Sequence, residues 1–141
     1  MTRSAAVLAL WALLVACSCG ASPDRSTGAL RTAVREGVAS VRSTTDLETL
    51  HTRLLGTLER IRALRESNPA TRRARVLALR GFGLTLRGVE RRLAFERNDS
   101  GEVAAATGDA VWADRYLSRG AALLRAAGNL LGVTVGTLNG Y

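Results

Sequence analysis

The chain has 141 residues, of which 20 are basic and 12 acidic, so its formal net charge is +8. This length accommodates one small domain. A single histidine and a small supply of carboxylates weigh against most metal and catalytic sites, and an aromatic content of 4% weighs against nucleic-acid modules that stack bases. The apolar content of 47% is too high for a wholly disordered chain, so a folded core is expected.

The first residues have the pattern of an export signal. Arg3 and the amino terminus carry positive charge, and an uncharged apolar stretch follows from Ala5 to Ala16. This stretch is too short for a transmembrane helix, which needs about 20 residues, but it suits the apolar region of a signal peptide. We therefore expect residues 1–16 to be a signal peptide that is removed.

The segment Leu14-Val15-Ala16-Cys17 resembles the lipobox of bacterial lipoproteins. All four positions match that motif, which is a branched apolar residue, a small or apolar residue, a small residue and Cys. The resemblance implies cleavage before Cys17, a diacylglycerol thioether on its sulfur and an acyl chain on its new amino group. Two or three acyl chains form a lasting membrane anchor, whereas a single chain holds a protein only marginally.

The resemblance covers residues 1–19 only, so it implies a location and no activity. That location is the extracytoplasmic face of the cell membrane, or the outer membrane where the cell has two membranes. The alternatives are an ordinary signal peptide cut near Ala21, with Cys17 discarded, and a buried helix that is not cleaved. Residues 17–23, which are small, polar and rich in Gly and Pro, predict a short lipidated tether.

Residues 24–141 predict a helical domain, because their apolar residues recur at helical spacing. The first helix is expected from Asp24 or Ser26 to Arg42. A second helix follows candidate caps at residues 43–46, where Thr45 and Glu48 have the spacing of a capping box. The apolar positions of these two helices are Leu30, Val34, Val38, Val41, Leu47, Leu50, Leu54, Leu58 and Ile61.

Asn68-Pro69 is the clearest break in the chain, and a third helix is expected from about Ala70 to Glu96. This helix has two apolar lines, which indicates a central position in a bundle. The first line is Leu79, Phe82, Leu86, Val89 and Leu93, and the second is Leu77, Leu84 and Phe95.

A last helix is expected after a turn at residues 97–101, with Asp99 or Ser100 as its cap. Its seam is built mostly of small residues, which permit close helix approach. Trp112 and Tyr116 lie one turn apart on an adjacent face, where they can stack. The seam comprises Val103, Ala106, Ala110, Ala113, Leu117, Gly120, Leu124, Ala127 and Leu131. The predicted fold is therefore all-α, a small antiparallel bundle of about four helices with a loosely ordered C-terminal tail.

The positive charge is concentrated in the third helix. Eight Arg and two Glu between Arg72 and Arg97 leave a balance of +6, whereas the residues from Ser100 onward are balanced. Four of these arginines form a stripe beside the apolar seam: Arg73, Arg80, Arg87 and Arg91. The stripe has two interpretations. In the first, the arginines dock on anionic lipid head groups or wall polymers, and each basic group contributes about 1 kcal/mol of binding free energy. In the second, they belong to a solvated helix face and pair with Glu59, Glu66 or Asp109.

Glycines at intervals of four or eight residues lie near the C-terminus, where they would share one helical face. The set is Gly120, Gly128, Gly132, Gly136 and Gly140. Such a ladder permits close helix packing in membranes, with Gly128, Gly132 and Gly136 as the contact points. Arg125 and Asn129 interrupt the segment, and a central Arg costs about 2.5–3.5 kcal/mol on insertion. We therefore expect the helix to fray beyond Leu131 and the tail to be loose or to pack back.

The remaining polar candidates are His51, Asp109, Asp114, Arg115 and Arg119. Asp109 and Asp114 do not share a helical face, and His51 has no identifiable nucleophile or metal partner. Hydrolase, metalloprotease, P-loop and dinucleotide motifs are absent from the sequence. We expect no enzyme, no metal, no nucleic acid and no cofactor apart from the lipid on Cys17.

The sequence thus predicts a membrane-anchored extracytoplasmic lipoprotein that acts as a non-catalytic interaction or envelope-structure module. Its expected partners are the membrane and an envelope protein, anionic lipid or wall polymer. The alternative is a membrane-active or oligomerising protein that uses the glycine ladder. A further class, an enzyme accessory subunit or hydrolase without a standard motif, stays open.

Overall fold

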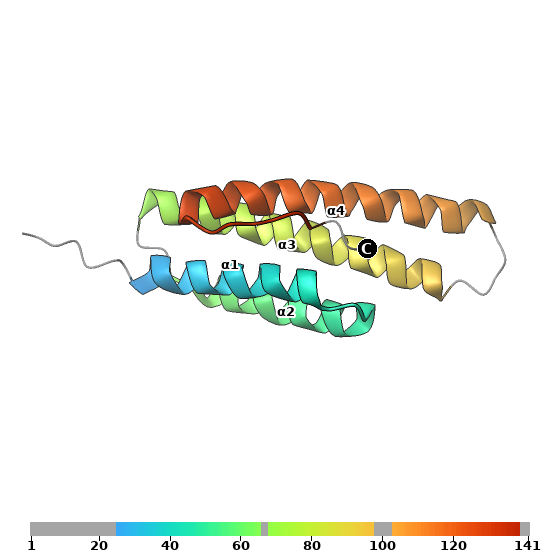
Figure 1. The fold of residues 1–141 in the computed structure, drawn as a ribbon, viewed down its shortest axis with the longest axis horizontal. Coiled ribbons are helices and arrows are strands. Elements are labelled where there is room, and N and C mark those ends of the chain that lie inside the picture. The colour runs from blue at the N-terminus through green and yellow to red at the C-terminus, as the bar shows by residue number, and fades with distance from the viewer. Residues whose placement is uncertain (1–24, 66–67, 98–102, 139–141) are drawn as a thin grey trace, which may run out of the picture.

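The structure is a computed structural model that describes residues 25–65, 68–97 and 103–138. Within these ranges the chain forms four helices and no strand: α1 (Arg25–Ser43), α2 (Leu47–Ala63), α3 (Pro69–Glu96) and α4 (Val103–Leu131). Successive helices run in opposite directions and pack side by side (Figure 1). The predicted all-α antiparallel bundle is confirmed. The predicted signal peptide, Cys17 and the candidate caps Asp99 and Ser100 lie outside the described residues.

Two helix starts are fixed by polar side chains. The Oδ2 atom of Asp46 accepts a hydrogen bond from the backbone N–H of Thr49 at 2.7 Å, which caps α2. Among the candidate caps at residues 43–46, Asp46 is therefore the cap, and Thr45, which has capping-box spacing with Glu48, is not. Asn68 caps α3 in the same way, since its Oδ1 accepts from the N–H of Thr71 at 2.8 Å and Pro69 follows in the first turn.

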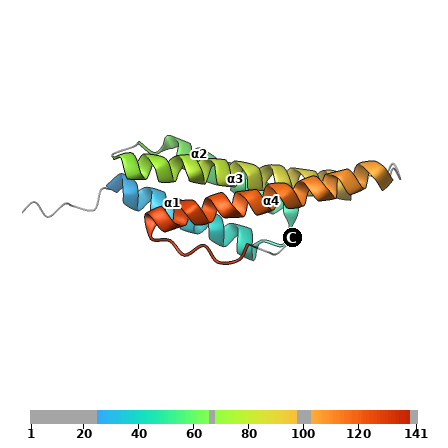
Figure 2. The ribbon, with the colours of Figure 1, turned by 90° about the horizontal axis from the view of Figure 1, so that it is seen from above.

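The bundle consists of two hairpins of unequal length. α1 and α2 have 19 and 17 residues, whereas α3 and α4 have 28 and 29. At about 1.5 Å per residue, the second hairpin is roughly 15 Å longer than the first. Its excess length projects past the α1–α2 hairpin at the end where α3 leads into α4 (Figures 1 and 2). The α1–α2 hairpin thus covers only one side of α3 and α4, and only part of their length.

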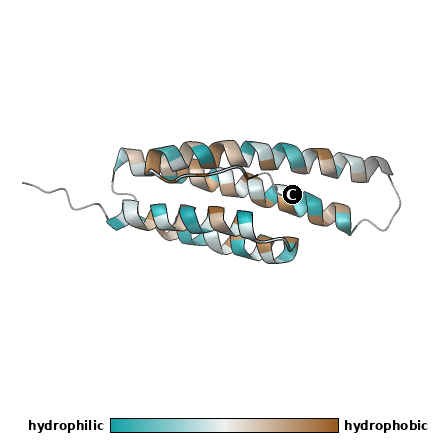
Figure 3. Ribbon diagram, in the orientation of Figure 1, coloured by the Kyte–Doolittle hydropathy of each residue, from teal (hydrophilic) through white to brown (hydrophobic). Residues whose placement is uncertain are grey.

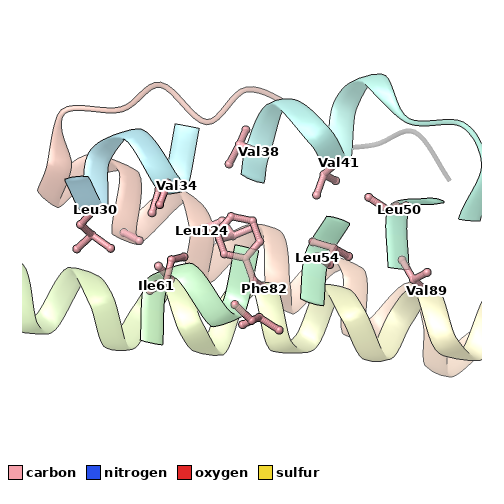
Figure 4. Close-up of a cluster of buried hydrophobic side chains, with 14 of the residues drawn as sticks. Leu30, Val34, Val38, Val41, Leu50, Leu54, Ile61, Phe82, Val89 and Leu124 are labelled. Carbon is pink, nitrogen blue, oxygen red and sulfur yellow. The ribbon is translucent and has the colours of Figure 1, made fainter. Parts of the chain in front are cut away.

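The core lies where the two hairpins face each other. Its largest fully buried side chains include Phe82, Leu30, Leu50, Leu54, Ile61 and Leu124, which point toward one another (Figure 4). Gly37 makes room for the ring of Phe82, because a Cβ at Gly37 would lie 2.5 Å from Cζ of Phe82. Hydrophilic residues alternate with these apolar positions along every helix (Figure 3).

The predicted apolar lines of α3 are confirmed in part. Phe82, Val89 and Leu93 are buried, and the partly buried Leu79, Leu86 and Leu77 pack against the core. The exception is Phe95, which is 46% exposed. It lies three turns after Leu84 on the same side of α3. That side is not the one that packs on the α1–α2 hairpin, so the hairpin does not cover Phe95.

α3 and α4 approach closely because small residues face each other along the pair. A Cβ added to Gly120 would lie 2.6 Å from Oγ1 of Thr85 and 2.9 Å from the backbone oxygen of Gly81. A Cβ at Gly88 would lie 2.7 Å from Cγ of Leu117. The middle of the predicted seam of α4, at Leu117, Gly120 and Leu124, therefore contacts α3.

The chain turns back after α4. Gly132 has a φ of 65°, a left-handed conformation that suits glycine and ends the helix. The following segment, residues 133–138, has no helix and runs beside α1 and α4 (Figure 2). Its Val133, Val135 and Leu138 pack against the core, and the N–H of Val133 donates to the oxygen of Gly128 at 2.9 Å. Of the two alternatives, a loosely ordered tail and one that packs back, residues 133–138 adopt the second.

The glycine ladder does not exist as one helical face. Gly132 is the turn itself, Gly136 lies in the returning segment, and Gly140 is outside the described residues. Gly128 faces the protein's own tail, because a Cβ there would lie 2.6 Å from the oxygen of Val133. The prediction that Gly128, Gly132 and Gly136 form a helix-packing row is wrong, since α4 ends at Leu131.

Candidate functional site

The predicted arginine stripe lies on the exposed side of α3. Arg73, Arg80 and Arg87 are all exposed, and helical spacing places them opposite the buried residues Ala78 and Thr85. In the described part of the chain, no ion pair involves these three side chains. Their positive charge is therefore directed outward.

The fourth member of the stripe has a different environment. Arg91 forms an ion pair with Asp109 of α4, with Nη1 2.6 Å from Oδ1. The hydrogen bond and charge of Asp109 raise the pKa of Arg91 above its ordinary value. A second pair joins Arg92 to Asp114 at 2.8 Å. Asp109 and Asp114 thus neutralise arginines across the α3–α4 interface.

An aromatic pair lies on α4 near the projecting end. The rings of Trp112 and Tyr116 are stacked, with centroids 5.8 Å apart and planes at 30°. The guanidinium carbon of Arg115 lies 5.2 Å from the centroid of the Trp112 ring, which is the geometry of a cation–π contact. The predicted stacking is confirmed, and Trp112 remains 45% exposed.

The basic side of α3 and the aromatic side of α4 form one continuous face. A hollow of about 360 Å³ is lined by Arg87, Glu90 and Arg91 of α3 together with Tyr116. A neighbouring hollow of about 350 Å³ is lined by Arg80, Leu84 and Arg87 together with Leu123. Arg119 lies between Tyr116 and Leu123 at helical spacing, and Leu130 continues the same line two turns further on.

We call this surface the outer face of the α3–α4 hairpin. It comprises Arg73, Arg80, Leu84, Arg87 and Arg91 of α3 with Trp112, Tyr116, Arg119, Leu123 and Leu130 of α4. It is turned away from the α1–α2 hairpin, because the opposite sides of α3 and α4 carry the buried core.

The nearby carboxylates leave most of this positive charge uncompensated. Asp109 is engaged by Arg91, and Oε1 of Glu90 lies 3.5 Å from Nε2 of His51 on α2. Arg119, like the three stripe arginines, forms no ion pair within the described ranges. The outer face therefore carries several guanidinium groups next to exposed aromatic and aliphatic side chains.

Sequence reasoning missed Arg119, Leu123 and Leu130 as members of this face. The signal is present in the sequence, because these residues continue the line of Trp112 and Tyr116 at intervals of three, four and seven. Their significance depends on which flank of α4 adjoins the arginines of α3. That relation requires the register of the two helices, which spacing within one helix does not give.

Two further arginines act within the fold. Arg75 donates to the backbone oxygens of Ile61 at 2.9 Å and Arg62 at 2.6 Å, and Arg31 donates to that of Leu131 at 2.7 Å. A cation at these positions satisfies the free carbonyls at the C-termini of α2 and α4. The position of an arginine thus determines whether its side chain stabilises the fold or lies on the outer face.

Comparison with protein-family models, curated proteins and solved structures yields no match. Within residues 25–65, 68–97 and 103–138, no group of three His, Cys, Asp or Glu side chains is placed to hold a metal ion. No helix in the same ranges combines the length and apolarity needed to cross a bilayer. The geometry of the outer face is therefore the basis for assigning a function.

Proposed function

We propose that the protein is a lipid-anchored, non-catalytic module on the extracytoplasmic face of a cell membrane, and that its outer face docks on an anionic surface of the envelope. The lipobox-like segment ending at Cys17 supports the anchor. The observation that carries the docking role is the row of exposed guanidinium groups at Arg73, Arg80 and Arg87, without ion-pair partners in the described part of the chain.

The spacing of this row suits a flat, extended anion. Residues seven apart on a helix are separated by about 10 Å along its axis and project from nearly the same side. Three side chains on α3 therefore span roughly 20 Å of a surface at once. Each basic group near an anionic bilayer contributes about 1 kcal/mol, and the contributions add when the groups reach the surface together.

The anchor strengthens such docking without any new contact. A protein held at a membrane by its acyl chains samples the nearby surface at a high effective concentration, so weak electrostatic contacts suffice. The outer face presents guanidinium, aromatic and aliphatic groups, rather than a nucleophile beside a base. Binding, rather than bond-making chemistry, is the role these groups support.

The docking role is tested with a chain of residues 20–141. Every core side chain of the described residues lies between Leu30 and Leu138, and this chain retains all of them. We expect it to sediment with vesicles of phosphatidylcholine mixed with phosphatidylglycerol, to bind pure phosphatidylcholine less, and to dissociate as salt rises. Changing Arg73, Arg80 and Arg87 to Gln weakens the binding by about 100-fold, at about 1 kcal/mol for each charge.

The matched control is the triple change of Arg25, Arg35 and Arg62 to Gln on α1 and α2. These side chains are also exposed and have no ion pair among the described residues, so the control removes the same net charge from another surface. We expect a much smaller loss of vesicle binding. Equal losses in both triple variants, or equal binding to neutral and anionic vesicles, contradict a docking role for the outer face.

The anchor is tested separately by metabolic labelling with a clickable fatty acid in a bacterium that processes lipoproteins. We expect label on the wild-type chain and on Cys19→Ser, and none on Cys17→Ser. Label that persists in Cys17→Ser contradicts the lipobox interpretation and leaves the docking experiment unaffected.

A further inference from the structure

The outer face is amphipathic as well as basic. Trp112 is 45% exposed and Leu130 is 46% exposed, although both are large apolar side chains in a small protein. The partly buried Leu84 and Leu123 lie between them and the arginines. A purely electrostatic docking surface requires none of these groups, so their position next to the arginine row needs an explanation of its own.

Trp112 is held in its exposed position. It lies in the first three turns of α4, the helix that begins at the end of the bundle where α3 and α4 project past the α1–α2 hairpin (Figures 1 and 2). Stacking on Tyr116 and the guanidinium of Arg115 restrict its ring. A side chain that is already ordered loses little conformational entropy when it binds.

This combination of groups matches the interface of a lipid bilayer. Tryptophan and tyrosine are enriched at the level of the lipid head groups, where one edge of the ring is apolar and the other is wet. Arginine and lysine on the polar flank of a surface-lying helix contact anionic head groups, while apolar side chains enter the boundary with the acyl chains. A wall polymer offers the anionic charge but has no apolar layer for Trp112 and Leu130.

The length of the chain before α1 is compatible with this placement. Eight residues, 17–24, separate the predicted lipid attachment at Cys17 from the bundle. A chain of that length spans at most about 29 Å, whereas a helix with its side chains is about 10–12 Å thick. Because the start of α1 lies at the same end as the end of α4 (Figure 1), the anchored chain can pass beside one helix while the outer face lies on the bilayer.

We infer that the anionic surface is the lipid bilayer itself, and that the bundle lies flat on it with the outer face of α3–α4 downward and Trp112 among the head groups. This inference rests on the proposed docking function and names its partner. The arginines supply long-range attraction, and Trp112 and Leu130 supply contacts that a soluble polyanion does not replace.

The chain provides its own probe. The sequence has two tryptophans, Trp11 and Trp112, so the chain of residues 20–141 contains Trp112 alone. We expect its fluorescence to shift to the blue and to be quenched by lipids brominated near the head-group end of their acyl chains, in vesicles containing phosphatidylglycerol. The matched control carries Trp112→Phe and Thr32→Trp, which moves the single indole to an exposed position of α1 on the opposite hairpin. We expect neither shift nor quenching in that control.

A binding measurement complements the spectroscopy. We expect Trp112→Ala to lower partitioning into anionic vesicles about tenfold, because a large apolar side chain leaves the interface. Leu55→Ala removes a side chain on α2 that is 42% exposed, and we expect it to leave partitioning unchanged. We expect circular dichroism to show that both variants keep the helical fold, since neither side chain belongs to the buried core.

The outcomes separate this inference from the proposed function. Binding to anionic vesicles with no spectral change at Trp112, or with equal quenching in the α1 control, overturns the flat orientation and leaves electrostatic docking intact. Binding to soluble poly(glycerol phosphate) but not to vesicles also overturns the bilayer assignment, and it redirects the docking function to a polymer. Absence of binding to both overturns the inference and the docking function together.

Discussion

At the residue scale, glycines of the same helix have opposite roles. Gly120 lies against Thr85 and the backbone of Gly81, so the α3–α4 contact depends on its missing side chain. Gly108 lies about three turns earlier in α4, with nothing within 4 Å of an added Cβ. The sequence presents both as glycines in a helix, and only the neighbouring helix distinguishes them. Their substitution by alanine therefore has opposite expected signs.

We expect Gly120→Ala to lower the free energy of unfolding by about 1–3 kcal/mol, because the added methyl group forces α3 and α4 apart. Gly108→Ala in the same helix is expected to raise it by about 0.5–1 kcal/mol, because alanine restricts the unfolded chain and favours the helix. Chemical denaturation followed by circular dichroism measures both. Two stabilising substitutions would contradict the close approach at Gly120.

A second residue-scale prediction concerns Asp46. Hydrogen bonds from the hydroxyl and the backbone N–H of Thr49 hold the pKa of this carboxyl below its ordinary value. A lowered folded-state pKa means that the ionised form stabilises the fold above the unfolded-state pKa, and that this contribution is lost as pH falls through the folded-state value. We expect Asp46→Ala to be less stable than the wild type at neutral pH, with the difference shrinking below about pH 4.

Asp46→Asn is the control, because it keeps a side-chain oxygen that accepts the bond from Thr49 and removes the charge. Its stability relative to Asp46→Ala should be nearly independent of pH. A stability difference between Asp46→Ala and the wild type that is constant from neutral to acidic pH shows that the charge of Asp46 does not contribute.

At the element scale, helix bounds follow from the sequence better than helix partners do. The expected start of the third helix at Ala70 differs by one residue from Pro69, and its expected end at Glu96 agrees. Caps, prolines and apolar spacing are local signals, so they can be identified in the sequence without knowledge of the tertiary structure. Phe95 shows the limit, because its burial depends on which side of α3 the neighbouring helices cover. The path of the C-terminal tail depends on its contacts with the core and with Gly128 of α4, which no local pattern predicts.

That tail gives an element-scale prediction. A chain ending at Leu131 loses Val133, Val135 and Leu138 from the core, and we expect it to be less stable by about 1–3 kcal/mol, since these side chains are partly buried and ordering a tail has an entropic cost. A chain ending at Leu138 is the control and should match the wild type. The midpoints of thermal unfolding are compared between the two truncated chains. Equal midpoints would falsify a structural role for the tail.

At the scale of the whole molecule, the sequence predicts several residues of the site, whereas the fold determines how they are arranged. The stripe of Arg73, Arg80 and Arg87 follows from spacing alone, as does the stacking of Trp112 on Tyr116. The pairing of Arg91 with Asp109, and the union of stripe and aromatic pair on one face, depend on how α3 and α4 are aligned. The register between α3 and α4 cannot be predicted from the residue pattern of either helix alone.

The unequal hairpins predict unequal protection across the molecule. Backbone amides of α3 and α4 that face the α1–α2 hairpin, such as those near Phe82 and Leu124, should exchange with deuterium slowly. Amides near Phe95 and Trp112 in the projecting end should exchange faster, because fewer buried contacts oppose their local opening. Hydrogen exchange followed by mass spectrometry compares the two regions. Uniform protection along α3 and α4 contradicts an independent projecting end.

The projection of α3–α4 also determines how far apart two attachment points lie. Trp112 and the end of α4 at Leu131 are separated by about 29 Å along the helix axis, and α1 begins at the same end of the bundle as Leu131. In the orientation that we propose, acyl chains hold the bundle near that end and Trp112 holds it near the other, so the bundle has little freedom to tilt or roll on the bilayer. The proposed orientation also turns the α1–α2 hairpin away from the membrane, so a protein that approaches from outside would meet α1 and α2 first.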